Sequence, residues 1–178
     1  MGSKSSRSVN SSSYSRNIGG GKNVDICDNN DRYDNIISIT KIKAYLKGRK
    51  GAIAGRVFGS IFTLGLINVS EDLRQLPEHW GLIFETEKKY YVIQYTDGGI
   101  LHSSSYSFQE CIDNIISCGD HYERKLYDEE DCKFRSGIDL GDVERAVKYL
   151  TPYFNENNYH SLRNNCQYFV KDLLERIR

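Results

Sequence analysis

Two runs rich in aromatic and β-branched side chains constrain the fold of this chain most. They are WGLIFET at 80–86 and KYYVIQYT at 89–96, and a short charged segment separates them. Side chains of these kinds favour extended strands, and two such runs with a short link between them are typical of an antiparallel pair. The sequence therefore predicts two neighbouring antiparallel strands, and the rest of the domain has to pack around them.

Three later segments have the apolar spacing of helices. Ser107 and Glu110 form a capping-box pattern that opens a short helix. Its inward residues are expected to be Phe108, Ile112, Ile115 and Ile116. A second helix, ending near Pro152, is predicted from the spacing of Leu140, Val143, Val147 and Leu150.

The last helix is expected to begin after Asn164 or Asn165. Its predicted buried residues are Cys166, Phe169, Val170, Leu173, Leu174 and Ile177. A weaker strand pattern lies at 122–127, YERKLY. Strands followed by helices predict an α+β fold in which an antiparallel sheet packs on helices.

The first part of the chain predicts a different organisation. Residues 1–32 are rich in Ser, Asn and Gly, which predicts a flexible tail. Its start, MGSKSS, fits the pattern for myristoylation of Gly2. Residues 33–75 are interpreted as a helical or apolar lead-in segment, and 76–178 as the main domain. Within the lead-in, 51–69 is the most apolar stretch, but it is too short and interrupted to span a bilayer, so it is either packed core or membrane-interfacial.

Charge is balanced overall but not along the chain. Lys plus Arg equal Asp plus Glu at 24 each, yet the first 50 residues carry ten basic residues against four aspartates, a surplus of six. A basic front half predicts contact with an anionic membrane surface, and a solvated basic tail is the plainer alternative. No nucleic-acid partner is expected, because the basic residues are not interleaved with stacking aromatics.

The cysteines indicate a reducing compartment. There are five of them, an odd number with no metal-ligand spacing, and the N-terminus has no apolar secretion segment. We expect free thiols, no metal and no cofactor, and an intracellular location at the cytoplasmic face of a membrane.

Cys166 is the residue that raises the question of catalysis. In the first turn of a helix, unpaired backbone N–H groups and the positive end of the helix dipole favour a thiolate. Those N–H groups are also expected to serve as oxyanion donors. The alternative is a buried structural thiol, since Cys166 also lies on the apolar stripe of its helix.

His79 and Gln94 are the candidate partners of that thiol. His79 lies at the start of the first strand, where its ring can act as a general base. Gln94 is polar within the apolar run YYVIQYT and can orient the ring through its other nitrogen. A strand-edge histidine and a solvent-facing glutamine are the plainer alternatives.

Together, HWG at 79–81, VIQ at 92–94 and NNCQYFV at 164–170 resemble the permuted papain-like thiol hydrolases. That group includes NlpC-type proteins, the lecithin:retinol acyltransferase-like lipid enzymes and the PPPDE isopeptidases. The resemblance covers roughly 76–178, and it implies a permuted papain-like (NlpC/LRAT-like) fold. It also implies that Cys166 is the nucleophile, His79 the general base and Gln94 the orienting residue.

The resemblance implies acyl transfer through a thioester and leaves the substrate open. The lipid branch has His at the position of Gln94 and Glu-His where this chain has Gln167 and Tyr168. The glycine-rich turn at 98–100 is similar to that of the isopeptidase branch. A membrane-associated phospholipase or acyltransferase is the first expectation. A cysteine isopeptidase is the second, and an inactive membrane-tethered interaction module is the third.

Overall fold

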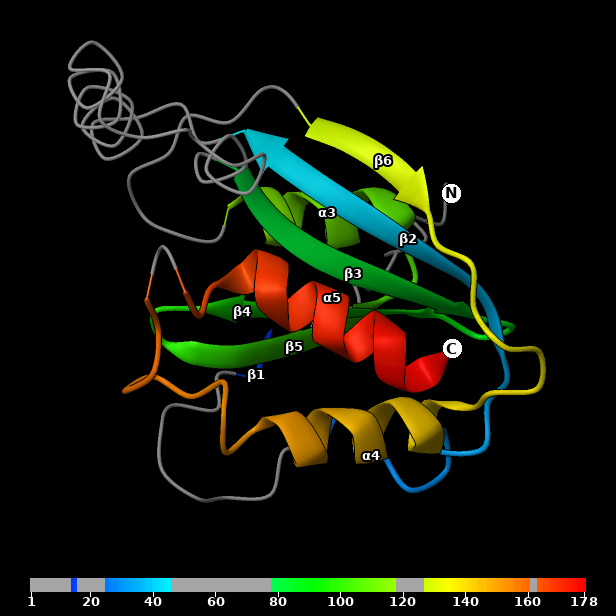
Figure 1. Ribbon diagram of the computed structural model, residues 1–178. Helices are drawn as coiled ribbons and strands as arrows, with labels where there is room; N and C mark the ends of the chain where they lie inside the picture. The colour runs from blue at the N-terminus through cyan, green and yellow to red at the C-terminus, as the bar shows by residue number, and fades with distance from the viewer. Residues whose placement is uncertain (1–13, 16–24, 46–77, 118–126, 161–162) are drawn as a thin grey trace, which may run out of the picture.

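The fold is an antiparallel sheet with helices on both faces. A computed structural model describes residues 14–15, 25–45, 78–117, 127–160 and 163–178. The sheet has the strand order β1-β5-β4-β3-β2-β6, and every neighbouring pair is antiparallel (Figure 1). The strands are β1 (Tyr14–Ser15), β2 (Ile36–Tyr45), β3 (Glu78–Thr86), β4 (Tyr90–Thr96), β5 (Gly99–Ser105) and β6 (Tyr127–Asp131). The helices are α3 (Phe108–Ile116), α4 (Leu140–Leu150) and α5 (Cys166–Ile177).

The predicted α+β class and the predicted strand pair are confirmed. The two runs singled out in the sequence form β3 and β4, and they pair with Leu82 opposite Ile93 and Phe84 opposite Tyr91. Because successive side chains of a strand point to opposite faces, these aromatic and branched residues cover both faces of the sheet centre.

Helices α4 and α5 cover one face of the sheet and α3 covers the other (Figure 1). The larger core lies under α4 and α5 and includes Leu82, Phe84, Tyr91, Ile93, Tyr95, Phe169 and Leu173. The smaller core lies under α3 and consists of Ile42, Ile83, Val92, Cys111, Ile112 and Ile115. Alternation along β3 and β4 thus places Ile83 and Val92 against α3, while Leu82 and Ile93 face the other two helices.

The predicted helix starts agree with the structure, with one difference in α3. The Ser107 side chain accepts from the backbone N–H of Glu110, but the Glu110 carboxylate binds the Ser105 hydroxyl instead of completing the box. Helix α4 begins with a full capping box between Asp139 and Asp142. Its length and its buried stripe match the prediction.

The predicted lead-in segment differs most from the structure. Residues 36–45 form β2, which lies between β3 and β6 and pairs with β3 along its length. The chain enters the globular unit earlier still, because Ile26 and Cys27 are buried in the larger core. Arg32 also makes a 2.8 Å ion pair with Glu144 of α4. The described part of the folded unit therefore includes 14–15 and 25–45 as well as the residues from 78, so the unit does not begin at 76.

Several predictions fall outside the described residues. They are the acylation of Gly2, the role of 51–69 and most of the weak strand at 122–127, of which only Tyr127 is seen, as the first residue of β6. In the part of the chain that the structure describes, no helix is long and apolar enough to cross a membrane.

Candidate functional site

Cys166 is the first residue of α5, as the sequence predicted. Asn165 is the N-cap, in extended conformation, and its side-chain oxygen accepts from the N–H groups of Gln167 at 3.0 Å and Tyr168 at 3.2 Å. An asparagine at this position stabilises the first turn of a helix by accepting from its unpaired donors. The cap therefore fixes the backbone from which the Cys166 side chain projects.

The Cys166 sulfur lies against the first residues of β3. Pairing of β3 with β4 runs from Glu85 to Gly81, so residues 78–80 extend past the end of that ladder. There the sulfur is 3.5 Å from the backbone nitrogen of Trp80 and 3.8 Å from the carbonyl oxygen of Glu78. Those two atoms belong to the peptide groups on either side of His79, so the thiol lies beside the backbone of the predicted base.

His79 and Gln94 contact each other directly. The Nε2 atom of His79 is 2.8 Å from Oε1 of Gln94, and both side chains are buried. Gln94 is paired with Gly81, and His79 is two residues from Gly81 along the same strand, so the two side chains lie on the same face of the sheet. The plainer alternatives, an edge histidine and a solvent-facing glutamine, do not describe these residues.

Gly81 makes room for this arrangement. A β-carbon built at this position would lie 2.9 Å from side-chain atoms of Ile115 in α3. The absence of a side chain lets α3 approach the sheet directly beside His79 and Gln94. This close approach explains the glycine in the HWG motif.

The structure changes one part of the prediction, the oxyanion donors. The N–H groups of Gln167 and Tyr168 bind the Asn165 side chain, so they are committed to the cap. The first-turn donor that this cap does not use is the N–H of Cys166 itself. The two N–H groups that the cap binds are therefore not offered to a reacting carbonyl.

The other described thiols have a different environment. Burial, with the neighbouring Glu144 carboxylate, raises the pKa of Cys27 to about 12. Burial, with Glu110 nearby, raises the pKa of Cys111 to about 12. Burial also raises the pKa of Cys132. Each of these groups is held as an uncharged thiol. Cys166 differs from them in its place at a helix N-terminus, where it also accepts the Trp80 N–H.

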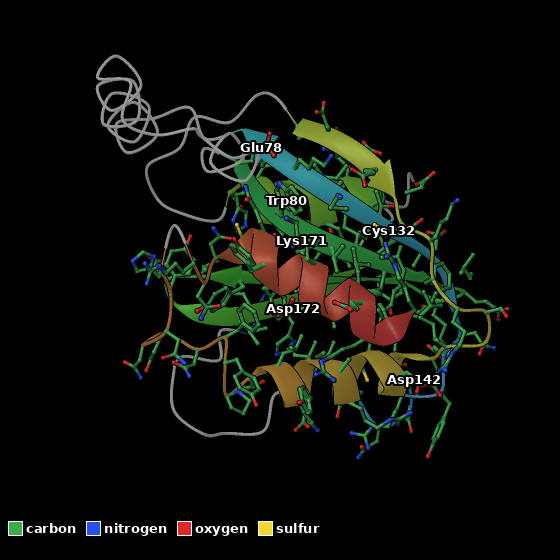
Figure 2. The ribbon with its side chains drawn as sticks, viewed as in Figure 1. Glu78, Trp80, Cys132, Asp142, Lys171 and Asp172 are labelled. Atoms are coloured by element: carbon green, nitrogen blue, oxygen red, sulfur yellow. The ribbon has the colours of Figure 1, made fainter. Side chains whose placement is uncertain are left out.

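Charged side chains of both signs lie around Trp80, the residue whose N–H contacts the sulfur. The Trp80 indole donates to the Glu78 carboxylate at 2.9 Å. The Lys171 ammonium is 5.9 Å from the centre of the Trp80 ring and 5.6 Å from that of Tyr168. In Figure 2, Glu78 and Trp80 follow each other along β3, with Lys171 beside them on α5.

A groove of about 800 Å³ lies between α5 and the C-terminal end of α4, and its lining includes Asn164, two residues before Cys166. Its lining is mixed and comprises Tyr149, Leu150, Tyr153, Phe154, Asn158, Arg163, Asn164, Tyr168, Asp172, Glu175 and Arg176. The Asn164 amide donates to the carbonyls of Tyr153 and Asn158, so the loop before Cys166 and the turn after α4 are tied together. Sequence reasoning did not identify this groove, because its residues come from three separate segments.

The structure thus brings together all three residues predicted from the sequence. Cys166 lies against the backbone flanking His79, and His79 contacts Gln94. Comparison with known proteins adds no assignment, since no family model, curated protein or solved structure matches this chain.

Proposed function

We propose that this protein is a thiol-dependent acyl-transfer enzyme with Cys166 as nucleophile, His79 as general acid and base, and Gln94 as orienting residue. One observation carries the proposal. The buried His79 uses Nε2 to contact Gln94, while the Cys166 sulfur lies against the peptide groups on either side of His79. A nucleophile, a base and a third group that holds the base are the parts that covalent thiol catalysis requires.

The proposed reaction has two steps. The Cys166 thiolate attacks the carbonyl carbon of the substrate, and His79 protonates the leaving group as the carbonyl reforms into a thioester on Cys166. In the second step His79 takes a proton from the acceptor, which attacks the thioester and releases the thiolate. Water as acceptor gives hydrolysis, and an amine or alcohol gives transfer.

The order of the residues along the chain supports placing the protein near the permuted papain-like enzymes. His79 precedes Cys166, which is the order in that group, and the antiparallel sheet with a thiol-bearing helix agrees with the same architecture. For the substrate we propose a lipid acyl group at a membrane surface first, on the strength of the Gly2 acylation pattern and the basic front half of the chain.

A polypeptide substrate is the second candidate, and the groove along α5 favours it. An acyl chain is best accommodated by apolar walls, whereas this groove contains two arginines, two acidic residues and two asparagines beside its aromatic residues. Side chains of this kind match the amide groups and mixed charges of an extended peptide.

The test compares both substrate classes with one protein. The full chain is incubated with phosphatidylcholine vesicles that contain a fluorescent acyl chain, and separately with fluorogenic peptide and isopeptide panels. Intact-mass measurement follows the acyl group on the enzyme. We expect turnover of one class only, a thioester on Cys166, and loss of both in Cys166→Ala and His79→Ala. Turnover that persists in Cys166→Ala would disprove the proposal, and absence of turnover and thioester with every panel would favour the interaction module.

A further inference from the structure

The last turn of α3 lies directly over the pair formed by His79 and Gln94. Three contacts hold it there. Ile115 fills the space left by Gly81, the Asn114 side chain donates to the Ser103 hydroxyl of β5 at 3.3 Å, and the Asn114 carbonyl lies 3.5 Å from the Gln94 side-chain nitrogen. Two consecutive residues of one helix therefore contact three neighbouring strands beside the proposed site.

The chemistry of these contacts fixes the direction of the Gln94 amide. A backbone carbonyl can only accept a hydrogen bond, so the end of Gln94 that faces Asn114 has to be the NH2 group. The opposite end, the oxygen Oε1, then faces His79 at 2.8 Å and can only accept. His79 must donate to it, which means that Nε2 carries a proton.

The same reasoning assigns the other nitrogen of the ring. With Nε2 protonated and engaged by Gln94, Nδ1 is the nitrogen through which a neutral imidazole can take a proton from a thiol. We propose that the C-terminal turn of α3 is a positioning element: through the Asn114 carbonyl it sets the orientation of Gln94 and, through Gln94, the protonation pattern of His79. The inference rests on the proposed function for its consequence in catalysis, but the hydrogen-bond chain can be measured without any substrate.

This series of hydrogen bonds also explains why residue 94 carries an amide side chain. The position needs a group that donates at one end and accepts at the other, and glutamine does so without charge. An ionised glutamate accepts at both ends, so its second oxygen would face the Asn114 carbonyl. Carbonyls at the end of a helix also carry its partial negative charge, which repels a carboxylate.

The first experiment follows the proton on His79 Nε2 by nitrogen-15 NMR in a Cys166→Ala background, where no catalysis can take place. We expect one protonated Nε2 signal with slow solvent exchange. Asn114→Ala and Ser103→Ala each remove the same bond between α3 and β5, so both are expected to speed that exchange about threefold to tenfold, the factor for one neutral hydrogen bond. The double variant should add little further, because the two side chains share one bond.

Gln109→Ala is the matched control, since Gln109 lies on the exposed side of α3 and its amide contacts Asp113. Exchange that is the same in Asn114→Ala, Ser103→Ala and Gln109→Ala would overturn the inference. So would a neutral His79 protonated at Nδ1. A missing thioester on the wild-type enzyme would instead disprove the proposed function and leave the exchange result standing.

A second measurement uses the rate of Cys166 alkylation in Gln94→Glu, relative to the wild type, from pH 5 to pH 8. A protonated glutamic acid can replace both contacts of the amide, and an ionised one cannot. We therefore expect the relative rate to fall at least tenfold as pH rises through this range. A relative rate that stays constant or increases would mean that the carboxylate simply pairs with His79, and the Asn114 carbonyl would then have no positioning role.

Discussion

At the scale of single residues, Cys166 is buried like Cys27 and Cys111, but it alone of these three is the first residue of a helix. Cys27 lies 3.5 Å from the Glu144 carboxylate and Cys111 is on the buried face of α3, and both have a pKa of about 12. Cys166 accepts a hydrogen bond from the Trp80 N–H at the positive end of the α5 dipole. Negative neighbours and burial disfavour a thiolate, while N–H donors stabilise one.

The first prediction concerns selective alkylation at pH 7.5. With a pKa of about 12, fewer than about one in ten thousand Cys27 or Cys111 side chains are ionised at this pH. Iodoacetamide is therefore expected to modify Cys166 at least tenfold faster than either, as measured by peptide mass spectrometry over time. The protein should carry Cys118→Ser, because residue 118 lies outside the described part of the chain.

The comparison is controlled by His79→Ala, which leaves the helix start unchanged and removes the proposed base. Its Cys166 is expected to react more slowly near neutral pH than that of the parent. Equal reaction rates for Cys166 and Cys111 in the folded parent would show that the start of α5 does not activate the thiol.

At the scale of elements, the start of α5 connects stability with reactivity. Asn165 accepts two hydrogen bonds in the first turn, so Asn165→Ala should lower the free energy of unfolding by about 1 kcal/mol. Asn165→Asp keeps the oxygen that accepts both hydrogen bonds and should preserve stability. Its added negative charge beside the sulfur should, however, slow alkylation of Cys166.

Urea unfolding and alkylation kinetics on the two variants measure these effects separately. The decisive outcome is a divergence, with Asn165→Asp as stable as the parent but less reactive. If the two properties fall together in both variants, the cap contributes stability alone and has no separate electrostatic effect on the thiol.

The elements also show what the sequence could and could not predict. β3, β4 and the three helices were predictable because their apolar spacing is strong, and the candidate residues followed from their places at a strand start and a helix start. β2 was missed because Lys41 and Lys43 interrupt its apolar pattern. Both pair with Glu130 of β6, a contact between distant segments that local patterns do not contain.

The positioning role of α3 could not have been predicted in the same way. It depends on a backbone carbonyl of Asn114 and on the space above Gly81, and neither has a signature in the residue types. The groove along α5 could not be predicted from the sequence either, because its walls come together only in the folded chain.

At the scale of the whole molecule, β2 joins the edge strand β6 to the rest of the sheet. It pairs with β3 over nearly all of its length and with β6 on its other side, and it contributes Ile39, Ile42 and Ala44 to the buried core. A chain that begins at residue 76, the boundary expected from sequence, lacks these contacts. We therefore predict that it does not fold, whereas one beginning at residue 25 does.

Circular dichroism and thermal unfolding of the two truncated chains test this prediction. The longer one should unfold in a single cooperative transition, and the shorter one should show none. A cooperative transition in the chain that begins at residue 76 would mean that β3 to α5 form an independent domain, as the sequence alone indicated.

The protonation of His102 provides the last prediction, because it links one buried ring to the stability of the whole fold. His102 is buried on β5, its Nε2 has no hydrogen-bond partner among the described residues, and burial lowers its pKa, with Asp25 and Glu144 opposing the shift. The unfolded chain then binds a proton at higher pH than the folded one. Stability is therefore complete above the unfolded value of about 6.5 and decreases as pH falls from there through the lower folded pKa.

Replacing His102 removes this proton-linked contribution. In His102→Gln the free energy of unfolding should change less between pH 7 and pH 5 than in the parent, as measured by urea titrations at half-unit steps. The range ends at pH 5 because Asp31 and Glu130, whose pKa values are lowered by their lysine partners, begin to lose those ion pairs only under more acidic conditions. Identical slopes in the two proteins would mean that the folded molecule accepts a charged His102 as readily as water does. In that case the field of Asp25 and Glu144 would fully offset the cost of burial.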